Sequence, residues 1–213
     1  MRSIGILGGT FDPVHNGHLR AAIECREKLK LDEVRLMPVN DPGHRNLTIA
    51  NSTQRLVMLR MATEISDGLE IEDCDINRGG VTYTIDSLEE LRQQNKKASL
   101  CFILGTDSFN RLHIWKRWKE LINYAHLIVV RRPGHPLDPE QDQIRELLNQ
   151  QQTSDASKLK KQTAGCVYLT EVPMIDISAT RLRDIFENNN DPTGLLPQTV
   201  IEYIKQHDLY KKE

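Results

Sequence analysis

The sequence predicts an α/β fold with a mainly parallel, doubly wound sheet. Six short apolar runs of strand length recur along the chain, and segments with apolar residues at helical spacing lie between them. This alternation is typical of a parallel sheet that helices cover on both faces. Because such sheets bind ligands beyond the carboxyl ends of their strands, we expect the functional residues in the loops that come after the strands.

The first third of the chain alternates twice between strand and helix. Residues 3–8 (SIGILG) are apolar and of strand length, so they are expected to form the first strand. Residues 18–31 have the spacing of an amphipathic helix. The run EVRLMPV at 33–39 then predicts the second strand, and residues 52–65 predict the next helix.

The middle of the chain continues the same pattern. Residues 68–74 (GLEIEDC) are expected to form a strand, and the spacing of residues 84–94 predicts a helix. Two more apolar runs, SLCFILG at 99–105 and HLIVVRR at 126–132, predict the fourth and fifth strands.

The last third ends in helices. Residues 137–163 are polar and glutamine-rich, which favours a surface helix and then a mobile loop. The run CVYLTEV at 166–172 predicts a sixth strand. Ser178 is a plausible N-cap for a helix, and Pro197 lies where the first turn of another helix would favour it.

The bulk composition is that of one domain. With 213 residues, of which 38% are hydrophobic, the chain can bury one core without disulfides. We expect a single Rossmann-like domain over residues 1–213, with a small helical part at 175–213. The net charge of −2 gives no strong field for nucleic acid or an anionic membrane, so any anionic substrate must be held locally. Oligomeric state is not predicted.

The cysteines and the N-terminus favour a cytoplasmic protein. The four cysteines lie far apart without a Cys-x-x-Cys pair, so neither a zinc site nor a disulfide framework is expected. They are expected to be reduced and mostly buried. The first apolar run is too short for a signal peptide, and no later run approaches the length of a membrane span.

The loop after the first strand has the composition of an anion site. The segment GGTFDPVHNGH (8–18) comes after a strand and opens a helix, so backbone N–H groups and the helix N-terminus face the strand end. Glycine allows a phosphate to approach the backbone closely. His15 and His18 can both point at one phosphate and stabilise its charge. The residues of this loop expected to contact the bound phosphate are Gly8, Gly9, Thr10 and Phe11.

Other interpretations of this loop are weaker. The glycine spacing does not match the dinucleotide fingerprint G-x-G-x-x-G, and no lysine precedes Lys28 to complete a Walker loop. A metal site at His15 and His18 has no obvious third and fourth ligand. A structural role, in which both histidines only cap a turn, is the remaining alternative.

Two motifs resemble the nucleotidyltransferase superfamily. His15 to His18 match its His-x-Gly-His element, and ISATRLR at 177–183 matches its Ile-Ser-x-Thr-x-x-Arg element. Nearly the whole chain is similar to the bacterial nicotinate-nucleotide adenylyltransferases. The resemblance implies adenylyl transfer from ATP to nicotinate mononucleotide, giving nicotinate adenine dinucleotide and pyrophosphate on the route to NAD. The further matching segments are PVNDPGHR (38–45), GGVTYTIDSLEEL (79–91), ILGTDSF (103–109), Trp115 and AHLIVVRRPG (125–134).

This chemistry suits histidine and arginine better than carboxylates. The attacking phosphate monoester is mostly dianionic at neutral pH, so no general base is required. The protein must instead align two anions for in-line attack, without a covalent intermediate, and neutralise their charge. The resemblance implies that His15 and His18 act at the α-phosphate, and that Arg183, Ser178 and Thr180 hold the β- and γ-phosphates. Mg²⁺ would bridge the phosphates and need no dedicated protein ligands.

The resemblance makes Gly8, Gly9, Thr10 and Phe11 expected ATP ligands. It also implies residues that bind the nucleoside parts of ATP. Gly105 and Asp107 correspond to a position near the adenosine ribose, although Asp107 is also a plausible helix N-cap. Of the pair Arg131 and Arg132 after the fifth strand, Arg131 is the expected ATP ligand. A solvated basic loop is the alternative there.

A second group is expected at the mononucleotide. Trp115 would stack on the pyridine ring, although Trp115 and Trp118 lie at helical spacing and either could be core. Tyr83 and Thr84 would meet the pyridine carboxylate, unless they only form a turn before the helix. Asn40, His44 and Arg45 come after the second strand and could reach the substrate, or form a solvated loop. The site residues so implied are Asn40, His44, Arg45, Tyr83, Thr84 and Trp115.

The chain departs from the family pattern twice. Gly43 replaces the second proline of the usual Pro-Pro-His-Lys or Pro-Pro-His-Arg loop, which makes that loop more flexible before substrate arrives. Lys116 stands where an aromatic residue usually comes after the tryptophan. Both departures concern substrate affinity and the choice between nicotinate and nicotinamide.

Two other functions are possible. A phosphopantetheine adenylyltransferase would share the first loop but lack the Trp115 segment and GGVTYTID. A nucleotide-sensing module would bind ATP or NAD without turnover. Binding alone would not require His15, His18 and Arg183 together, which argues against the sensor.

Overall fold

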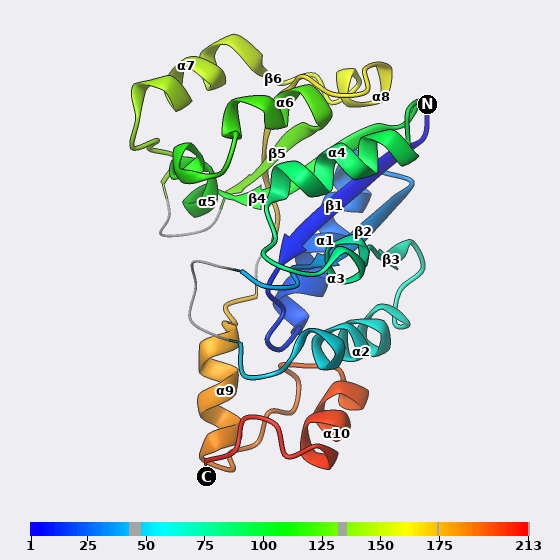
Figure 1. Ribbon diagram of the computed structural model, residues 1–213, viewed down its shortest axis with the longest axis vertical. Helices are drawn as coiled ribbons and strands as arrows, with labels where there is room; N and C mark the ends of the chain where they lie inside the picture. Colours follow the sequence, from blue (N-terminus) through cyan, green and yellow to red (C-terminus); the bar gives the residue numbers. More distant parts are fainter. Residues whose placement is uncertain (43–47, 132–135, 174, 213) are drawn as a thin grey trace.

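The computed structural model describes residues 1–42, 48–131, 136–173 and 175–212. Its centre is one sheet of seven parallel strands in the order β3-β2-β1-β4-β5-β7-β6 (Figure 1). The strands are β1 (Ser3–Gly9), β2 (Glu33–Pro38), β3 (Leu69–Ile71), β4 (Ser99–Gly105), β5 (His126–Arg131), β6 (Gln152–Thr153) and β7 (Val167–Glu171). The predicted doubly wound α/β fold is confirmed.

Helices cover both faces of this sheet. Those on one face are α1 (Asn16–Leu29), α2 (Ser52–Thr63) and α8 (Lys158–Lys161), and α9 (Ala179–Glu187) and α10 (Gln198–Gln206) share their hydrophobic cluster. Those on the other face are α3 (Cys74–Arg78), α4 (Thr84–Gln94), α5 (Thr106–Asn110), α6 (Leu121–Tyr124) and α7 (Asp142–Gln151). Two 3₁₀ turns, η1 (Leu112–Ile114) and η2 (Trp118–Glu120), connect α5 to α6.

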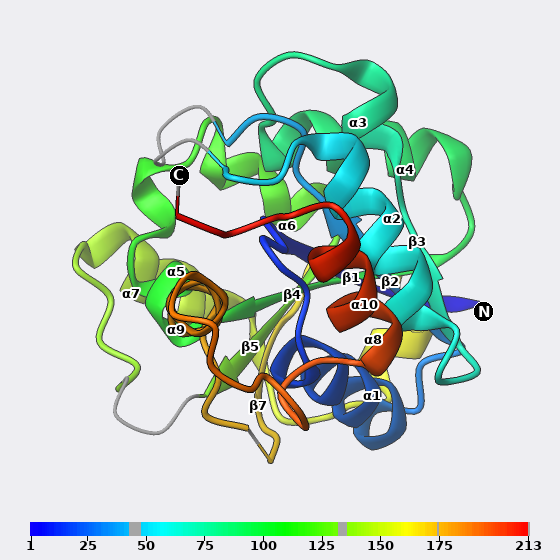
Figure 2. The same cartoon turned by 90° about the horizontal axis from the view of Figure 1, so that it is seen from below.

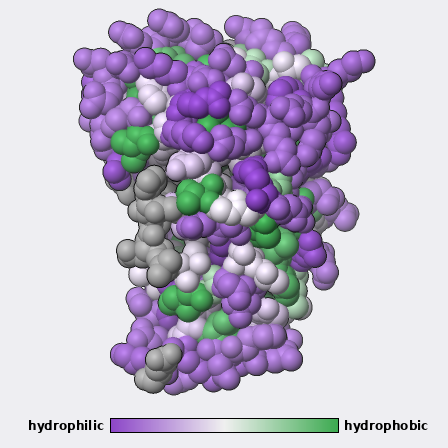
Figure 3. All heavy atoms as spheres, viewed as in Figure 1, coloured by the Kyte–Doolittle hydropathy of each residue, from purple (hydrophilic) through white to green (hydrophobic). Residues whose placement is uncertain are grey.

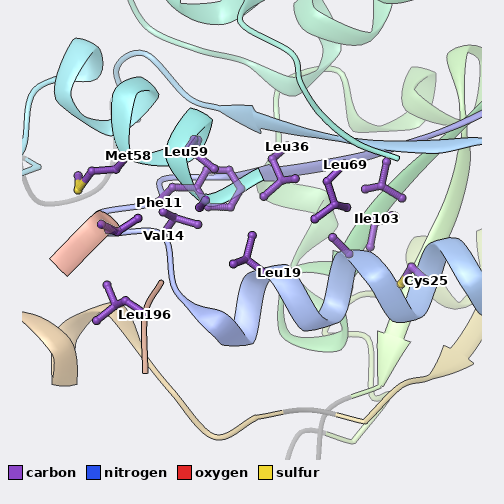
Figure 4. Close-up of a cluster of buried hydrophobic side chains, with 14 of the residues drawn as sticks. Phe11, Val14, Leu19, Cys25, Leu36, Met58, Leu59, Leu69, Ile103 and Leu196 are labelled. Carbon is purple, nitrogen blue, oxygen red and sulfur yellow. The ribbon is translucent and has the colours of Figure 1, made fainter. Parts of the chain in front are cut away.

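Strand alternation sorts the apolar side chains into two cores. Along β4, Leu100 and Phe102 lie in one cluster, while Cys101 and Ile103 lie in the other. Figure 4 shows the second of these clusters, in which Ile103 lies with side chains from α1 and α2. The C-terminal helices belong to the same cluster, because Leu182 of α9 and Ile204 of α10 are buried in it. This shared core supports the proposal of one domain over residues 1–213.

The strand order reverses at β1. Leu7 of β1 is aligned with Leu36 of β2 on one side and with Ile103 of β4 on the other. The loops after β1 and β4 therefore leave the sheet next to each other, at the switch point where doubly wound sheets bind ligands. In Figures 1 and 2, α9 and α10 lie at the end of the molecule toward which β1 points.

Two expected elements are wrong in part. The strand expected at 68–74 ends at Ile71, because Asp73 accepts a hydrogen bond from Asn77 and the chain turns into α3. The segment 137–163 contains the expected surface helix, α7, but the residues after α7 are not simply a loop. They form β6 at the sheet edge and then α8, because the buried Leu159 packs into the core and its carbonyl accepts a hydrogen bond from Ser99.

Helix starts differ from expectation by a residue or two. α1 begins at Asn16 instead of residue 18, because His15 has the extended backbone of an N-cap. Pro197 precedes α10 as its N-cap instead of lying in its first turn. Ser178 is the N-cap of α9, as expected, and its hydroxyl accepts a hydrogen bond from the backbone N–H of Arg181.

The four cysteines are free and buried, as the sequence predicts. Burial raises the pKa of the Cys25 and Cys101 thiols to about 12. The described helices include none with the length and apolar character that a membrane crossing requires. Figure 3 shows one face of the molecule, which is mostly hydrophilic with apolar residues in small scattered groups.

Candidate active site

The loop after β1 is shaped by its two glycines. A Cβ on Gly9 would lie 2.9 Å from the ring of Phe11, and one on Gly8 would lie 3.3 Å from the ring of Phe102. Phe11 itself has a left-handed backbone, with φ of 50°, and its side chain is buried. The Phe11 ring therefore lies beneath the loop, and its contribution to an ATP site would come through the backbone of Thr10 and Phe11.

His15 and His18 lie face to face at the end of this loop. Their ring centroids are 3.6 Å apart with an interplanar angle of 22°. The backbone N–H of His15 donates to Nδ1 of His18 over 3.3 Å, so Nε2 of His18 carries the ring proton in the neutral form. Phe11 contacts the His18 ring edge-on at 4.9 Å. His18 is thus held with its Nε2–H as the ring donor. His15 packs against it and is buried, with 5% of its surface exposed.

Arg183 reaches this loop from the other end of the chain. Its guanidinium donates to the backbone carbonyl of Asp12 over 2.8 Å and to the Thr180 hydroxyl over 3.1 Å. Ser178 caps the same helix. The structure therefore brings the ISATRLR motif against the GGTFDPVHNGH loop, although Asp12 and Arg183 are 171 positions apart in sequence.

Three further hydrogen bonds fix the C-terminal region on this loop. Asn16 donates from its backbone to Leu195 and from its side chain to Gly194. The hydroxyl of the buried Tyr210 donates to the carboxylate of Asp12 over 2.7 Å. Burial and the negative charge of Asp12 raise the pKa of Tyr210. Asn16, Asp12 and Tyr210 are not among the site residues predicted from the sequence.

The residues expected at the mononucleotide lie on a second pair of loops. The backbone N–H of Asn40 donates to the Thr82 hydroxyl over 3.0 Å, and its side-chain amide donates to the Gly80 carbonyl over 2.9 Å. Tyr83 is the N-cap of α4, and Thr84 is its first residue. The structure thus brings Asn40 next to the Tyr83–Thr84 segment. His44 and Arg45 lie outside the described residues.

Trp115 is half-buried and lies beside β4. Its ring meets Phe102 edge-on at 6.1 Å, and Phe102 is the residue beneath Gly8. Trp115 and Trp118 do not share a helix, because Trp115 has an extended backbone between η1 and η2, but both side chains pack against the core, as the alternative expected. Lys116, which stands at the usual aromatic position, places its ammonium 4.2 Å from the centroid of the Tyr83 ring.

The remaining predicted ATP residues lie after β4 and at the end of β5. Gly105 is the N-cap of α5, so Asp107 lies in the first turn and the N-cap interpretation of Asp107 is wrong. Arg131 is the last residue of β5, and its exposed guanidinium pairs with Glu171 over 3.2 Å. Of this group, Gly105 and Asp107 lie at the switch point with the β1 loop, whereas Arg131 is one strand farther along the sheet.

Arg55 is a residue near the site that its sequence context did not reveal. Its side chain is fully buried on α2, and it donates to the carbonyls of Thr10 and Val39, both over 2.7 Å. Burial lowers the pKa of Arg55, an effect that the negative charge of Asp12 opposes. One sequence pattern could have indicated its burial: an arginine stands on the apolar face of the helix. Arg55, Met58, Leu59 and Ala62 share that buried face.

Comparison with known proteins agrees with this geometry. A family model described as cytidylyltransferase-like matches residues 6–185. A probable nicotinate-nucleotide adenylyltransferase of Aeromonas salmonicida is 42% identical over 210 residues, covering 99% of this chain and 98% of the relative. A probable nicotinate-nucleotide adenylyltransferase of Methylococcus capsulatus is 38% identical over 210 residues, covering 98% of this chain and 100% of the relative. The chain belongs to the nicotinate-nucleotide adenylyltransferase family.

Membership of this family confirms the resemblance found in the sequence and makes the chain a nucleotidyltransferase. A solved structure of Plasmodium falciparum nicotinic acid mononucleotide adenylyltransferase complexed with NaAD matches with a TM-score of 0.76. The match covers 99% of this chain and 98% of that one, at 18% identity. At that identity the likeness shows a shared fold.

Proposed function

We propose that this chain transfers the adenylyl group of ATP to nicotinate mononucleotide, giving nicotinate adenine dinucleotide and pyrophosphate. The observation that carries the proposal is the hydrogen bond from Arg183 to the Asp12 carbonyl, which joins the two motifs at the sheet's switch point. The names of the full-length relatives support the same reaction. The four free cysteines are compatible with the cytoplasmic location that we propose with it.

The reaction needs alignment more than acid–base chemistry. An oxygen of the acceptor phosphate forms a bond to the α-phosphorus of ATP, and the bond from that phosphorus to the bridging oxygen breaks, so pyrophosphate leaves with its electron pair. We propose that His18 donates its Nε2–H to the α-phosphate and that His15 supports it from behind. Arg183, Ser178 and Thr180 hold the β- and γ-phosphates at the N-terminus of α9.

Mg²⁺ is proposed as a ligand of the ATP phosphates. In the ranges that the structure describes, no three His, Cys, Asp or Glu side chains are grouped so as to hold a metal ion. A donor set without clustered carboxylates fits an ion that keeps its waters and is carried by the nucleotide. When bound, Mg²⁺ would neutralise phosphate charge. The protein's own task is then to orient the phosphates through the β1 loop and Arg183.

Replacing Trp115 with alanine should weaken the binding of nicotinate mononucleotide more than the binding of ATP. Stacking of a ring on an aromatic side chain is worth about 1–3 kcal/mol, so the KM for nicotinate mononucleotide should rise roughly 5- to 150-fold. Steady-state kinetics with each substrate varied in turn measures this. Trp118→Ala is the matched control, since Trp118 packs on the same core. Equal increases of both KM values in Trp115→Ala would contradict the assignment.

The proposed reaction itself is tested by its products. With ATP, Mg²⁺ and nicotinate mononucleotide, we expect pyrophosphate and nicotinate adenine dinucleotide in equal amounts, separated and quantified by chromatography. Release of AMP without any dinucleotide would show hydrolysis and would contradict transfer to the acceptor.

A further inference from the structure

Arg55 has no place in the chemistry described above, yet it donates along all three of its guanidinium nitrogens. Besides the carbonyls of Thr10 and Val39, it donates through Nη2 to the carbonyl of Asn40 over 2.8 Å and through Nε to that of Ala50 over 3.3 Å. Buried arginines usually pair with carboxylates in direct contact. This one binds four backbone carbonyls that belong to two different loops.

The carboxylate of Asp12 binds the same segment as Arg55, through backbone N–H groups. It is 5% exposed and accepts the backbone N–H groups of Ile49 and Ala50 over 2.9 and 3.1 Å, together with the Tyr210 hydroxyl. The segment between β2 and α2 begins at Val39, and its last residues before α2 include Ile49 and Ala50. Arg55 and Asp12 therefore hold both of its described ends against residues 10–12.

These contacts join the two halves of the proposed site. Residues 10–12 belong to the β1 loop, and the carbonyl of Asp12 also accepts the hydrogen bond from Arg183. Asn40 contacts Thr82 and Gly80, next to Tyr83. A shift at Arg55 would consequently move the residues proposed for the acceptor relative to those proposed for the phosphates.

We propose that Arg55 is a positioning residue, which aligns the acceptor with the α-phosphate of ATP. Asp12 and Tyr210 support it in this role. The proposal rests on the proposed function, because it assigns the two loops to the two substrates. Because Arg55 is fully buried, it is not expected to contact either substrate. Its effect should therefore appear in kcat, since reacting atoms misplaced by about 1 Å can lose roughly a hundredfold in rate.

Arg55→Lys tests this directly. Lysine keeps the charge but lacks the planar fork that reaches carbonyls in several directions, so some of the four carbonyls lose their donor. We expect kcat to fall roughly 10- to 100-fold. The KM values for ATP and nicotinate mononucleotide should stay within about threefold of the wild type, because the ligand-contacting groups are unchanged.

Arg92→Lys is the matched control. Arg92 is also a guanidinium that donates to backbone carbonyls, those of Asn95, Ala98, Tyr124 and Thr163. These carbonyls lie at the opposite end of the strands, where Ala98 precedes β4. Both variants should lower the melting temperature. Only Arg55→Lys should lower kcat, when both are assayed well below their melting temperatures.

The outcomes separate the two proposals. If the wild type makes no dinucleotide, the proposed function fails. If the wild type is active and Arg55→Lys keeps its kcat, or if Arg92→Lys loses kcat to the same extent, the positioning role is overturned. If Arg55→Lys does not fold, Tyr210→Phe decides, with Tyr203→Phe as its control. Loss of the hydrogen bond that the Tyr210 hydroxyl donates to Asp12 should lower kcat roughly 3- to 10-fold, and an unchanged kcat would overturn the proposal.

Discussion

Replacing His18 with alanine should lower kcat roughly 100- to 1,000-fold, while the protein stays folded. The expected loss is that of one preorganised donor to a transition state. His18 is held for this task, because the His15 backbone binds Nδ1 and leaves Nε2–H to donate. The ring is stacked on His15 and packed against Phe11, so its orientation is set before substrate arrives.

The measurement is steady-state pyrophosphate release, with thermal unfolding of the same preparations. The control is His207→Ala, because His207 is an exposed residue of the C-terminal region that stacks on Tyr203 outside the site. ATP binding by His18→Ala, measured by calorimetry, should change much less than kcat. Turnover at the wild-type rate in His18→Ala would exclude the proposed role of this histidine.

Replacing Arg183 with alanine should raise the KM for ATP and also lower kcat. We expect kcat/KM for ATP to fall about a hundredfold or more, because the guanidinium is proposed to hold the β- and γ-phosphates as charge builds on the leaving pyrophosphate. Part of the loss should come from the β1 loop itself, since Arg183 donates to the Asp12 carbonyl. The KM for ATP should therefore rise while kcat falls.

Arg181→Ala provides the control for this variant. Arg181 lies on the same helix and is exposed. Varying ATP and the mononucleotide separately distinguishes the two possible assignments of Arg183. An effect confined to the KM for nicotinate mononucleotide would place Arg183 at the acceptor instead of at the ATP phosphates.

The fold and the first loop could be predicted because their signals are local. The run at 99–105 coincides with β4, since an apolar strand buried on both faces has no competing pattern. Helix α4 coincides with its predicted range, 84–94, because apolar spacing defines it from end to end. The strand predicted at 68–74 is too long, because Asp73 and Asp75 accept local hydrogen bonds from Asn77 and Arg78, which favour α3.

The contacts that assemble the site could not be predicted in the same way. Tyr210 binds Asp12 across 198 positions, and no local period encodes that pairing. Arg55 lies at an apolar position of an ordinary amphipathic helix, so its carbonyl partners become evident only when the loops are placed in space. Lys116 departs from the family's aromatic residue, and the structure shows that it instead covers the Tyr83 ring.

The most direct test of the central claim compares acceptors. Pyrophosphate release from ATP and Mg²⁺ is measured with nicotinate mononucleotide, nicotinamide mononucleotide and phosphopantetheine offered separately. The proposed function predicts release with nicotinate mononucleotide far above the other two. Release only with phosphopantetheine would contradict the substrate while keeping the site chemistry, and no release with any acceptor would contradict adenylyl transfer and favour a nucleotide-binding module.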